Sequence, residues 1–228
     1  MAINQIAWHQ LTSTFQSQGV TLVAVSKIKP VSDIRALYEL GQRDFGENYV
    51  QELADKQPQL PADLRWHFIG HLQSNKVKYI AGFVQLIHGV DSLRLLQEIN
   101  KQAGKNNRTI DVLLQVHIAQ EETKFGLDAR ELAEILSAGN LAALQHVRIR
   151  GLMGMASFTD STDQLRQEFG NIKALFEEYR ELFSGKGQAA LFQEPPILSM
   201  GMSGDFALAV EAGSTMVRIG SLLFGARS

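Results

Sequence analysis

Residues 21–26 read Thr-Leu-Val-Ala-Val-Ser, and residues 110–116 read Ile-Asp-Val-Leu-Leu-Gln-Val. Both runs are short, apolar and rich in β-branched side chains, a composition that favours buried strands over helices. Residues 31–40, which follow the first run, instead place apolar side chains at helical spacing and stop at Gly41. A strand followed by a helix is therefore the unit from which the fold is predicted.

Eight strands of this kind are expected, each followed by a helix or a helical turn. The strands are predicted within residues 21–26, 44–47, 66–69, 84–87, 110–116, 147–153, 197–200 and 216–219. The helices are predicted within residues 31–40, 48–57, 73–80, 91–103, 128–138, 161–183 and 203–212, after one extra helix within residues 3–18.

This alternation determines the predicted fold class. Strands that alternate with helices imply a parallel sheet with right-handed crossovers. Eight units in 228 residues predict an α/β protein, a single (β/α)8 TIM barrel over residues 1–228 with an extra N-terminal helix. An open doubly wound sheet is the alternative. That fold usually carries a glycine-rich fingerprint after its first strand, and residues 27–30 contain no glycine.

Composition narrows the function classes. The 22 Lys and Arg against 24 Asp and Glu residues give a formal net charge of −2, so no broad positive field attracts nucleic acid or an anionic membrane. The absence of cysteine removes disulfides, thiolate nucleophiles and iron–sulfur sites. The N-terminus lacks the pattern of a signal peptide, and no apolar run reaches the roughly 18–20 residues of a membrane helix. A cytoplasmic protein is predicted, with neither nucleic acid nor a membrane as its partner.

Lys27 is the first candidate for chemistry. It is the first charged residue after the apolar run 21–26, so it should lie at the rim of the barrel, where loops at the carboxyl ends of the strands carry function. A lysine partly removed from water loses affinity for its proton and becomes a nucleophile toward aldehydes. The alternative is a solvated loop lysine, which is our interpretation of Lys29.

Two glycine-containing segments near the C-terminus predict an anion site. Residues 198–206 end a strand and enter a helix, with Ser203 as the expected N-cap, and residues 212–221 place Arg218 and Gly220 at the end of the last strand. Barrels commonly bind phosphate at this point. Since Lys27 is on the neighbouring first strand, the expected ligand is an aldehyde that carries a phosphate. Pyridoxal 5′-phosphate (PLP) and the sugar phosphate of a Schiff-base aldolase both meet this description.

Other candidate ligand residues are weaker. His67 and His71 are four residues apart, but no HExxH pattern is present, so no metal site is predicted and His67 is expected to be a core histidine. Met153, Met155, Met200 and Met202 end two strands, where methionine fills apolar gaps or lines a ring-shaped ligand.

Five ordered blocks resemble one known family. They are Ala-Val-Ser-Lys-Ile-Lys-Pro at 24–30, Phe-Gly-Glu-Asn-Tyr-Val-Gln-Glu at 45–52, Trp-His-Phe-Ile-Gly-His-Leu-Gln-Ser-Asn-Lys at 66–76, Leu-Ser-Met-Gly-Met-Ser-Gly-Asp at 198–205 and Gly-Ser-Thr-Met-Val-Arg-Ile-Gly at 213–220. The chain resembles the pyridoxal-phosphate homeostasis proteins, the proline-synthetase co-transcribed type. This resemblance implies a barrel similar to the N-terminal domain of alanine racemase, the PLP fold type III.

The resemblance also implies site residues. Lys27 would hold PLP as a Schiff base, the internal aldimine. The cofactor-binding residues implied for the phosphate are Ser203, Gly204, Arg218 and Gly220. Those implied near the ring are Asn48 and Met155. One position departs from the family pattern, since His117 stands where Asn commonly follows Gln-Val.

The family is regarded as non-catalytic, and the sequence agrees with that expectation. Racemisation needs an acid or base on each face of the cofactor. In alanine racemase the acid or base on the second face is a tyrosine from an additional β domain of the partner subunit. This chain ends at Ser228, and its four tyrosines lie in predicted helices. The predicted function is PLP homeostasis and amino-acid and vitamin B6 balance, with an exposed PLP face, no robust catalysis and a monomeric state. Apo PLP-dependent enzymes are candidate partners; the alternatives are an amino-acid racemase and a regulatory partner protein that senses PLP.

Overall fold

Eight parallel strands close into a barrel in the order of the sequence, and the last strand pairs with the first. The computed structural model describes residues 3–119, 125–184 and 194–225. Its strands are β1 (Thr21–Val25), β2 (Asp44–Glu47), β3 (Arg65–Phe68), β4 (Leu86–Val90), β5 (Ile110–Gln115), β6 (Val147–Met153), β7 (Ile197–Met202) and β8 (Met216–Ile219). The predicted (β/α)8 barrel is confirmed, and the open-sheet alternative is excluded.

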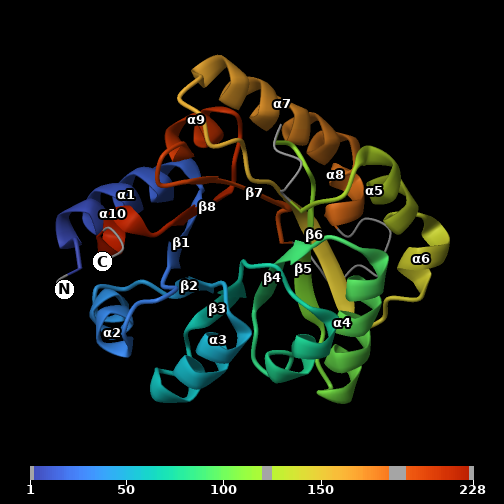
Figure 1. Ribbon diagram of the computed structural model, residues 1–228, viewed down its shortest axis with the longest axis horizontal. Coiled ribbons are helices and arrows are strands. Elements are labelled where there is room, and N and C mark those ends of the chain that lie inside the picture. Colours follow the sequence, from blue (N-terminus) through green and yellow to red (C-terminus); the bar gives the residue numbers. More distant parts are fainter. Residues whose placement is uncertain (1–2, 120–124, 185–193, 226–228) are drawn as a thin grey trace.

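The helices form an outer ring around the strands (Figure 1). They are α1 (Gln5–Gln18), α2 (Val31–Glu39), α3 (Val50–Lys56), α4 (Leu93–Lys105), α5 (Ala129–Ile135), α6 (Ala138–Ala142), α7 (Thr162–Glu178), α8 (Arg180–Phe183), α9 (Phe206–Glu211) and α10 (Ser221–Phe224), with 3₁₀ turns η1 (Gln57–Gln59) and η2 (Ser74–Tyr79). The predicted extra N-terminal helix is α1. It lies against α10, where the Asn4 amide donates to the Leu223 carbonyl at 2.8 Å. None of the described helices combines the length and apolarity needed to cross a bilayer.

The structure corrects the type of one predicted helix and defines the end of another. The helix expected within residues 73–80 is the 3₁₀ turn η2, in which the Lys76 amide bonds to the Gln73 carbonyl three residues earlier. Ser74 and Asn75 begin this turn, and both residue types favour turns over helix interiors because their side chains compete for backbone groups. The long helix predicted within residues 161–183 is confirmed as α7, which ends where Tyr179 leaves the helical conformation with φ −102° and ψ 8°, before the short helix α8.

Side chains alternate between the inside of the barrel and the layer under the helices. On β8, Val217 and Ile219 pack in the outer layer, whereas Met216 belongs to a small inner apolar cluster together with Val23 and Leu113. Arg218 lies between the two outward residues and therefore faces inward. A TIM barrel interior is normally filled by branched apolar residues, so a buried arginine there is the informative deviation.

One glycine is required for barrel closure. Gly151 on β6 has φ +149°, and a Cβ at this position would lie 1.9 Å from the Ile197 carbonyl oxygen on β7. Only glycine lets these two strands approach at this point.

Candidate functional site

A cavity of about 400 Å³ opens at the carboxyl ends of β1, β2, β6, β7 and β8. The structure brings all seven sequence-predicted cofactor-binding residues to its wall: Lys27, Asn48, Met155, Ser203, Gly204, Arg218 and Gly220. Such a volume is within the range of small-ligand sites. The residues come from five strand ends that are far apart in the sequence, and closure of the barrel is what makes them neighbours.

Lys27 is the second residue after β1, and the backbone on both sides of it is tied to α3. The Ser26 carbonyl accepts a hydrogen bond from Lys56 Nζ at 2.8 Å, and the Ile28 amide donates to Glu52 Oε1 at 2.7 Å. Lys56 also donates to Glu52 at 2.6 Å. Ile28 has φ 60°, a conformation that β-branched residues rarely adopt. We call Lys56, Glu52 and Glu47 the α3 clamp; it holds the strained turn that presents Lys27.

The third member of the α3 clamp is fully buried. Glu47 Oε1 accepts hydrogen bonds from Lys56 Nζ at 2.8 Å and from the Ser26 hydroxyl at 2.7 Å. Its second oxygen, Oε2, is buried without a hydrogen-bond partner among the described residues. Burial raises the pKa of Glu47, although the charge of Lys56 opposes the shift. Sequence reasoning missed this clamp; the four-residue spacing of Glu52 and Lys56 on one helix was the signal available.

Ser203, Gly204 and Gly220 form a polar part of the wall of the same cavity. The Gly220 amide donates to Ser203 Oγ at 3.3 Å, and a Cβ at Gly204 would meet no atom within 4 Å. The predicted role of Ser203 as an N-cap is wrong, because α9 begins at Phe206 after Asp205. The Asp205 carboxylate instead accepts from the Met202 amide at 2.6 Å and closes the preceding turn, which leaves Ser203 facing Gly220.

Arg218 is a buried cation at the floor of the cavity. It is 3% exposed, and burial lowers the pKa of its guanidinium to about 10. Its nitrogens donate to neutral oxygens, at 2.6 Å to Ser199 Oγ and at 3.0 Å to the Gly154 carbonyl. Within the described residues no carboxylate forms an ion pair with it. The negative charge of Asp205, which lines the same cavity, opposes this lowering of the pKa without forming an ion pair with Arg218. A buried charge without an ion-pair partner is costly, so an anionic or electron-rich ligand would be favoured here.

Asn48 and Met155 complete the wall. The Oδ1 atom of Asn48 is buried and has no hydrogen-bond partner within the described residues, so a polar ligand substituent would satisfy it. Met155 is partly buried and packs on the inner apolar cluster, where it offers an apolar surface. An amine, a cation, an orphaned polar atom and an apolar wall around one cavity fit PLP, which carries an aldehyde, a phosphate, a hydroxyl and a ring.

The remaining sequence candidates lie outside this cavity, apart from Met202. His67 is a core histidine, as expected, and bonds to Asp44 and His88, whereas His71 is exposed and contacts Asp91 at 3.1 Å. No group of three potential metal ligands occurs within residues 3–119, 125–184 and 194–225. His117 follows β5 and does not line the cavity. Met153 and Met200 are buried gap-fillers, and Met202 lines the cavity mouth.

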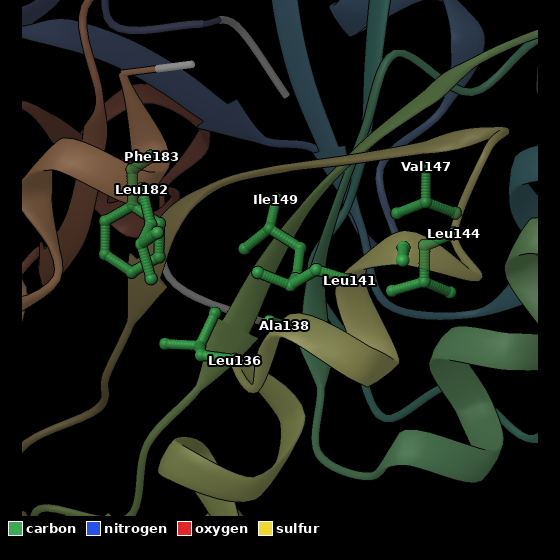
Figure 2. A pocket seen from close by; sticks show the side chains of 9 residues that line it. Leu136, Ala138, Leu141, Leu144, Val147, Ile149, Leu182 and Phe183 are labelled. Carbon is green, nitrogen blue, oxygen red and sulfur yellow. The ribbon is translucent and has the colours of Figure 1, made fainter. Parts of the chain in front are cut away.

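A second cavity lies outside the barrel, between β6 and helices α5, α6 and α8. Figure 2 shows its apolar side chains converging from these elements, with Leu141 and Ile149 facing Leu182 and Phe183. Its volume is about 330 Å³. The side chains that line it are aliphatic or aromatic, so it offers no side-chain cation or nucleophile for a phosphate-bearing aldehyde.

Sequence relatives cover almost the whole chain. The family model of the alanine racemase N-terminal domain matches residues 7–228. A pyridoxal phosphate homeostasis protein of Aquifex aeolicus is 42% identical over 207 residues, which are 90% of this chain and 86% of the relative. Its Escherichia coli K12 counterpart is 40% identical over 215 residues, 92% of this chain and 87% of the relative.

This chain belongs to the pyridoxal phosphate homeostasis protein family. Solved structures agree with the assignment. PipY of Synechococcus elongatus PCC7942 is 38% identical over 97% of this chain and 100% of its own, with a TM-score of 0.83 without PLP and 0.81 with PLP bound. Alanine racemase of Bartonella henselae has a TM-score of 0.68 over 99% of this chain and 60% of its own at 18% identity, which supports the shared fold alone. The predicted family and its racemase-like barrel are confirmed.

Proposed function

We propose that this pyridoxal phosphate homeostasis protein binds PLP in the cavity at the carboxyl ends of its strands and holds it without robust catalysis. The observation that carries the proposal is the convergence of Lys27 and the unpaired cation Arg218 on one cavity of about 400 Å³. The PLP-bound PipY relative, which is similar over 97% of this chain, supports the same ligand. The binding unit is the barrel, proposed as one domain over residues 1–228.

The residues of the cavity wall are proposed to contact different parts of PLP. Lys27 would hold PLP through its amine, and PLP would supply the aldehyde for a Schiff-base linkage to that amine, with water as the leaving group. Ser203, Gly204 and Gly220 are proposed to receive the phosphate, since the open space at Gly204 lets an anion approach the backbone closely. Arg218 supplies the buried positive charge, and Asn48 offers its unsatisfied amide to a ring substituent. Met155 packs against the ring.

The cavity mouth favours a carrier over a racemase. Phe158 is 100% exposed and Met202 36% exposed at the cavity, so the wall is open to solvent on that side. No tyrosine in the described part of the chain lines the cavity; Tyr49 belongs to a neighbouring hollow and is 55% exposed. A racemase needs an acid or base on the second face of the cofactor. An exposed Schiff base instead exchanges readily with free amines, as a PLP reservoir requires.

The biological setting follows from this chemistry. We propose a role in PLP homeostasis and amino-acid and vitamin B6 balance, with transfer of PLP to apo PLP-dependent enzymes. The cytoplasmic location and the monomeric state stay predictions. The second candidate is a regulatory partner protein that senses PLP. It is favoured only if another protein binds this chain in a PLP-dependent manner.

Visible absorption of the purified protein with added PLP tests the proposal. The parent should show a Schiff-base band, and borohydride reduction followed by peptide mapping should place the pyridoxyl group on Lys27. Lys27→Ala should lose the band. Lys29→Ala is the matched control: Lys29 is not the solvated loop lysine we expected, since it lines the same cavity, but its Nζ donates to the Phe224 carbonyl at 3.1 Å, so the variant should keep the band. A parent without a band at saturating PLP would refute the proposal and favour the aldolase.

A racemisation assay separates the carrier from the enzyme. Each amino acid is incubated with the PLP-loaded parent, and the enantiomers are resolved by chiral chromatography. The carrier predicts no stereospecific turnover above that of free PLP. Turnover at an ordinary enzymatic rate, lost in Lys27→Ala, would establish the racemase instead.

A further inference from the structure

A chain of buried hydrogen bonds crosses the barrel interior from Arg218 to the opposite mouth. Arg218 Nη1 bonds to Ser199 Oγ at 2.6 Å, and Ser199 Oγ to His88 Nδ1 at 3.1 Å. His88 Nε2 bonds to His67 Nδ1 at 3.0 Å, and His67 Nε2 to Asp44 Oδ1 at 3.0 Å. β4 and β7 are not neighbouring strands, so the His88–Ser199 bond spans the interior rather than following the sheet.

With both imidazoles neutral, the two ends of this chain fix its direction. Arginine can only donate, and an ionised carboxylate can only accept. Ser199 therefore accepts from Arg218 and donates its hydroxyl hydrogen to His88 Nδ1. His88 then carries its hydrogen on Nε2 and donates to His67 Nδ1, which leaves His67 with its hydrogen on Nε2 for Asp44. One arrangement with two neutral imidazoles satisfies every group along the chain.

The surroundings agree with this arrangement. Burial lowers the pKa of His88 well below its usual value, and the positive charge of Arg218 acts in the same direction, so His88 is neutral. Burial alone would raise the pKa of Asp44, but hydrogen bonds from Arg65 and His67 lower it to about 2. Arg65 reaches Asp44 with two nitrogens, at 2.7 and 2.6 Å, and is half exposed at the amino-terminal mouth. The far end of the chain is thus a fixed negative charge.

We propose that Ser199, His88, His67 and Asp44 are positioning residues that orient Arg218 toward the ligand through a one-way chain of hydrogen bonds, whose dipoles stabilise its buried charge. The proposal rests on the proposed binding of PLP at the Arg218 end. In each hydrogen bond of the chain the donor atom lies on the Arg218 side and its hydrogen points toward Asp44. The negative ends of the bond dipoles therefore face Arg218 and stabilise a cation at the ligand site. An interior filled with apolar residues would orient no guanidinium and compensate no charge.

Nitrogen-15 NMR of the ligand-free protein tests the arrangement directly. The spectra of His67 and His88, assigned with single His→Gln variants, should show both rings neutral and protonated on Nε2. This readout does not depend on PLP. A ring protonated on Nδ1, or a cationic ring at neutral pH, would overturn the one-way chain.

The positioning role is tested with Ser199→Ala, which removes the link between Arg218 and His88. PLP affinity should fall about tenfold or more, as expected when a hydrogen bond to a charged group is lost, and the absorption maximum of bound PLP should shift. Ser199→Thr keeps the hydroxyl and should restore both. Ser157→Ala is the matched control, because Ser157 is also buried and bonded, at 2.6 Å to Glu168, but stands outside the chain.

The outcomes separate the two proposals. Unchanged affinity and absorption in Ser199→Ala, with PLP bound by the parent, would refute the positioning role alone. A parent that does not bind PLP would refute the proposed function and the positioning role together. If Ser199→Ala fails to fold, Asp44→Asn tests the same role from the far end, and unchanged absorption in that variant would equally overturn it.

Discussion

Replacing Lys56 by methionine should destabilise the fold far more than an ordinary salt-bridge deletion. Methionine keeps most of the apolar stem of lysine, so packing is preserved and the charge is what is removed. The variant leaves Glu47, which is 0% exposed, without a cation, and it leaves the Ser26 carbonyl without a donor. Removing one partner of a buried ion pair costs about 3–5 kcal/mol, and we expect a loss of that size in the free energy of unfolding.

The pH dependence of this loss identifies its cause. The folded-state pKa of Glu47 is raised by burial above that of an unfolded chain, so protonation favours the fold at low pH and the benefit is lost as the pH rises through the folded pKa. Without Lys56 the pKa rises further. The destabilisation should therefore be larger at about pH 8 than at about pH 5, and Glu47→Gln should recover part of it when added to Lys56→Met.

Urea unfolding of the parent, Lys56→Met and the Lys56→Met/Glu47→Gln double variant at both pH values measures these differences. Lys173→Met is the matched control, since Lys173 and Glu177 also form an (i, i+4) pair but are 34% and 40% exposed, and it should cost less than about 0.5 kcal/mol. A loss below about 1 kcal/mol for Lys56→Met, or a loss that does not change with pH, would refute the role assigned to Lys56. Weaker PLP binding should accompany the loss, because the α3 clamp holds the backbone beside Lys27.

Three further predictions concern stability, each measured by urea unfolding. The pKa of Asp44 is about 2 in the fold against about 3.9 in an unfolded chain, so Asp44→Asn should cost about 2 kcal/mol at neutral pH, and the difference should vanish as the pH falls toward 2. Gly151→Ala should cost more than about 3 kcal/mol, because its Cβ would collide with the Ile197 carbonyl; a milder effect would show that β6 and β7 can separate. Ser161→Ala removes the side chain that caps α7 at Gln164 and should cost about 1 kcal/mol, whereas Ser161→Asp should cost almost nothing.

The pattern of apolar residues predicted the barrel because each strand can be recognised from its own short stretch of sequence. The apolar runs at 21–26 and 110–116 are the strands β1 and β5 almost to the residue, since burial on both faces demands continuous apolar sequence. The helix expected within 203–212 was the weaker prediction. It began too early, because Ser203 resembles an N-cap in sequence while the turn closed by Asp205 delays α9 to Phe206.

The location of the candidate site was also predictable, because a strand end is a position that a sequence reveals. Lys27 and Arg218 follow or end apolar runs, and barrel closure pairs β1 with β8, so the two were expected near one another. Their supports were not predictable. Glu47 reads as an ordinary charge at the end of a short strand, and only the structure shows it 0% exposed with one oxygen that has no hydrogen-bond partner among the described residues.

The buried hydrogen-bond chain shows why such supports escape a sequence. His67, His88 and Ser199 come from three strands, and no spacing connects them, since the contacts form only where the closed barrel brings inward-facing positions of β3, β4 and β7 together. Each residue alone is a polar exception on an apolar strand. Together they join a negative charge at one mouth to a positive charge at the other. The interior of this barrel therefore connects its two ends electrostatically, and the amino-terminal mouth, usually important only for stability, becomes part of the proposed ligand site.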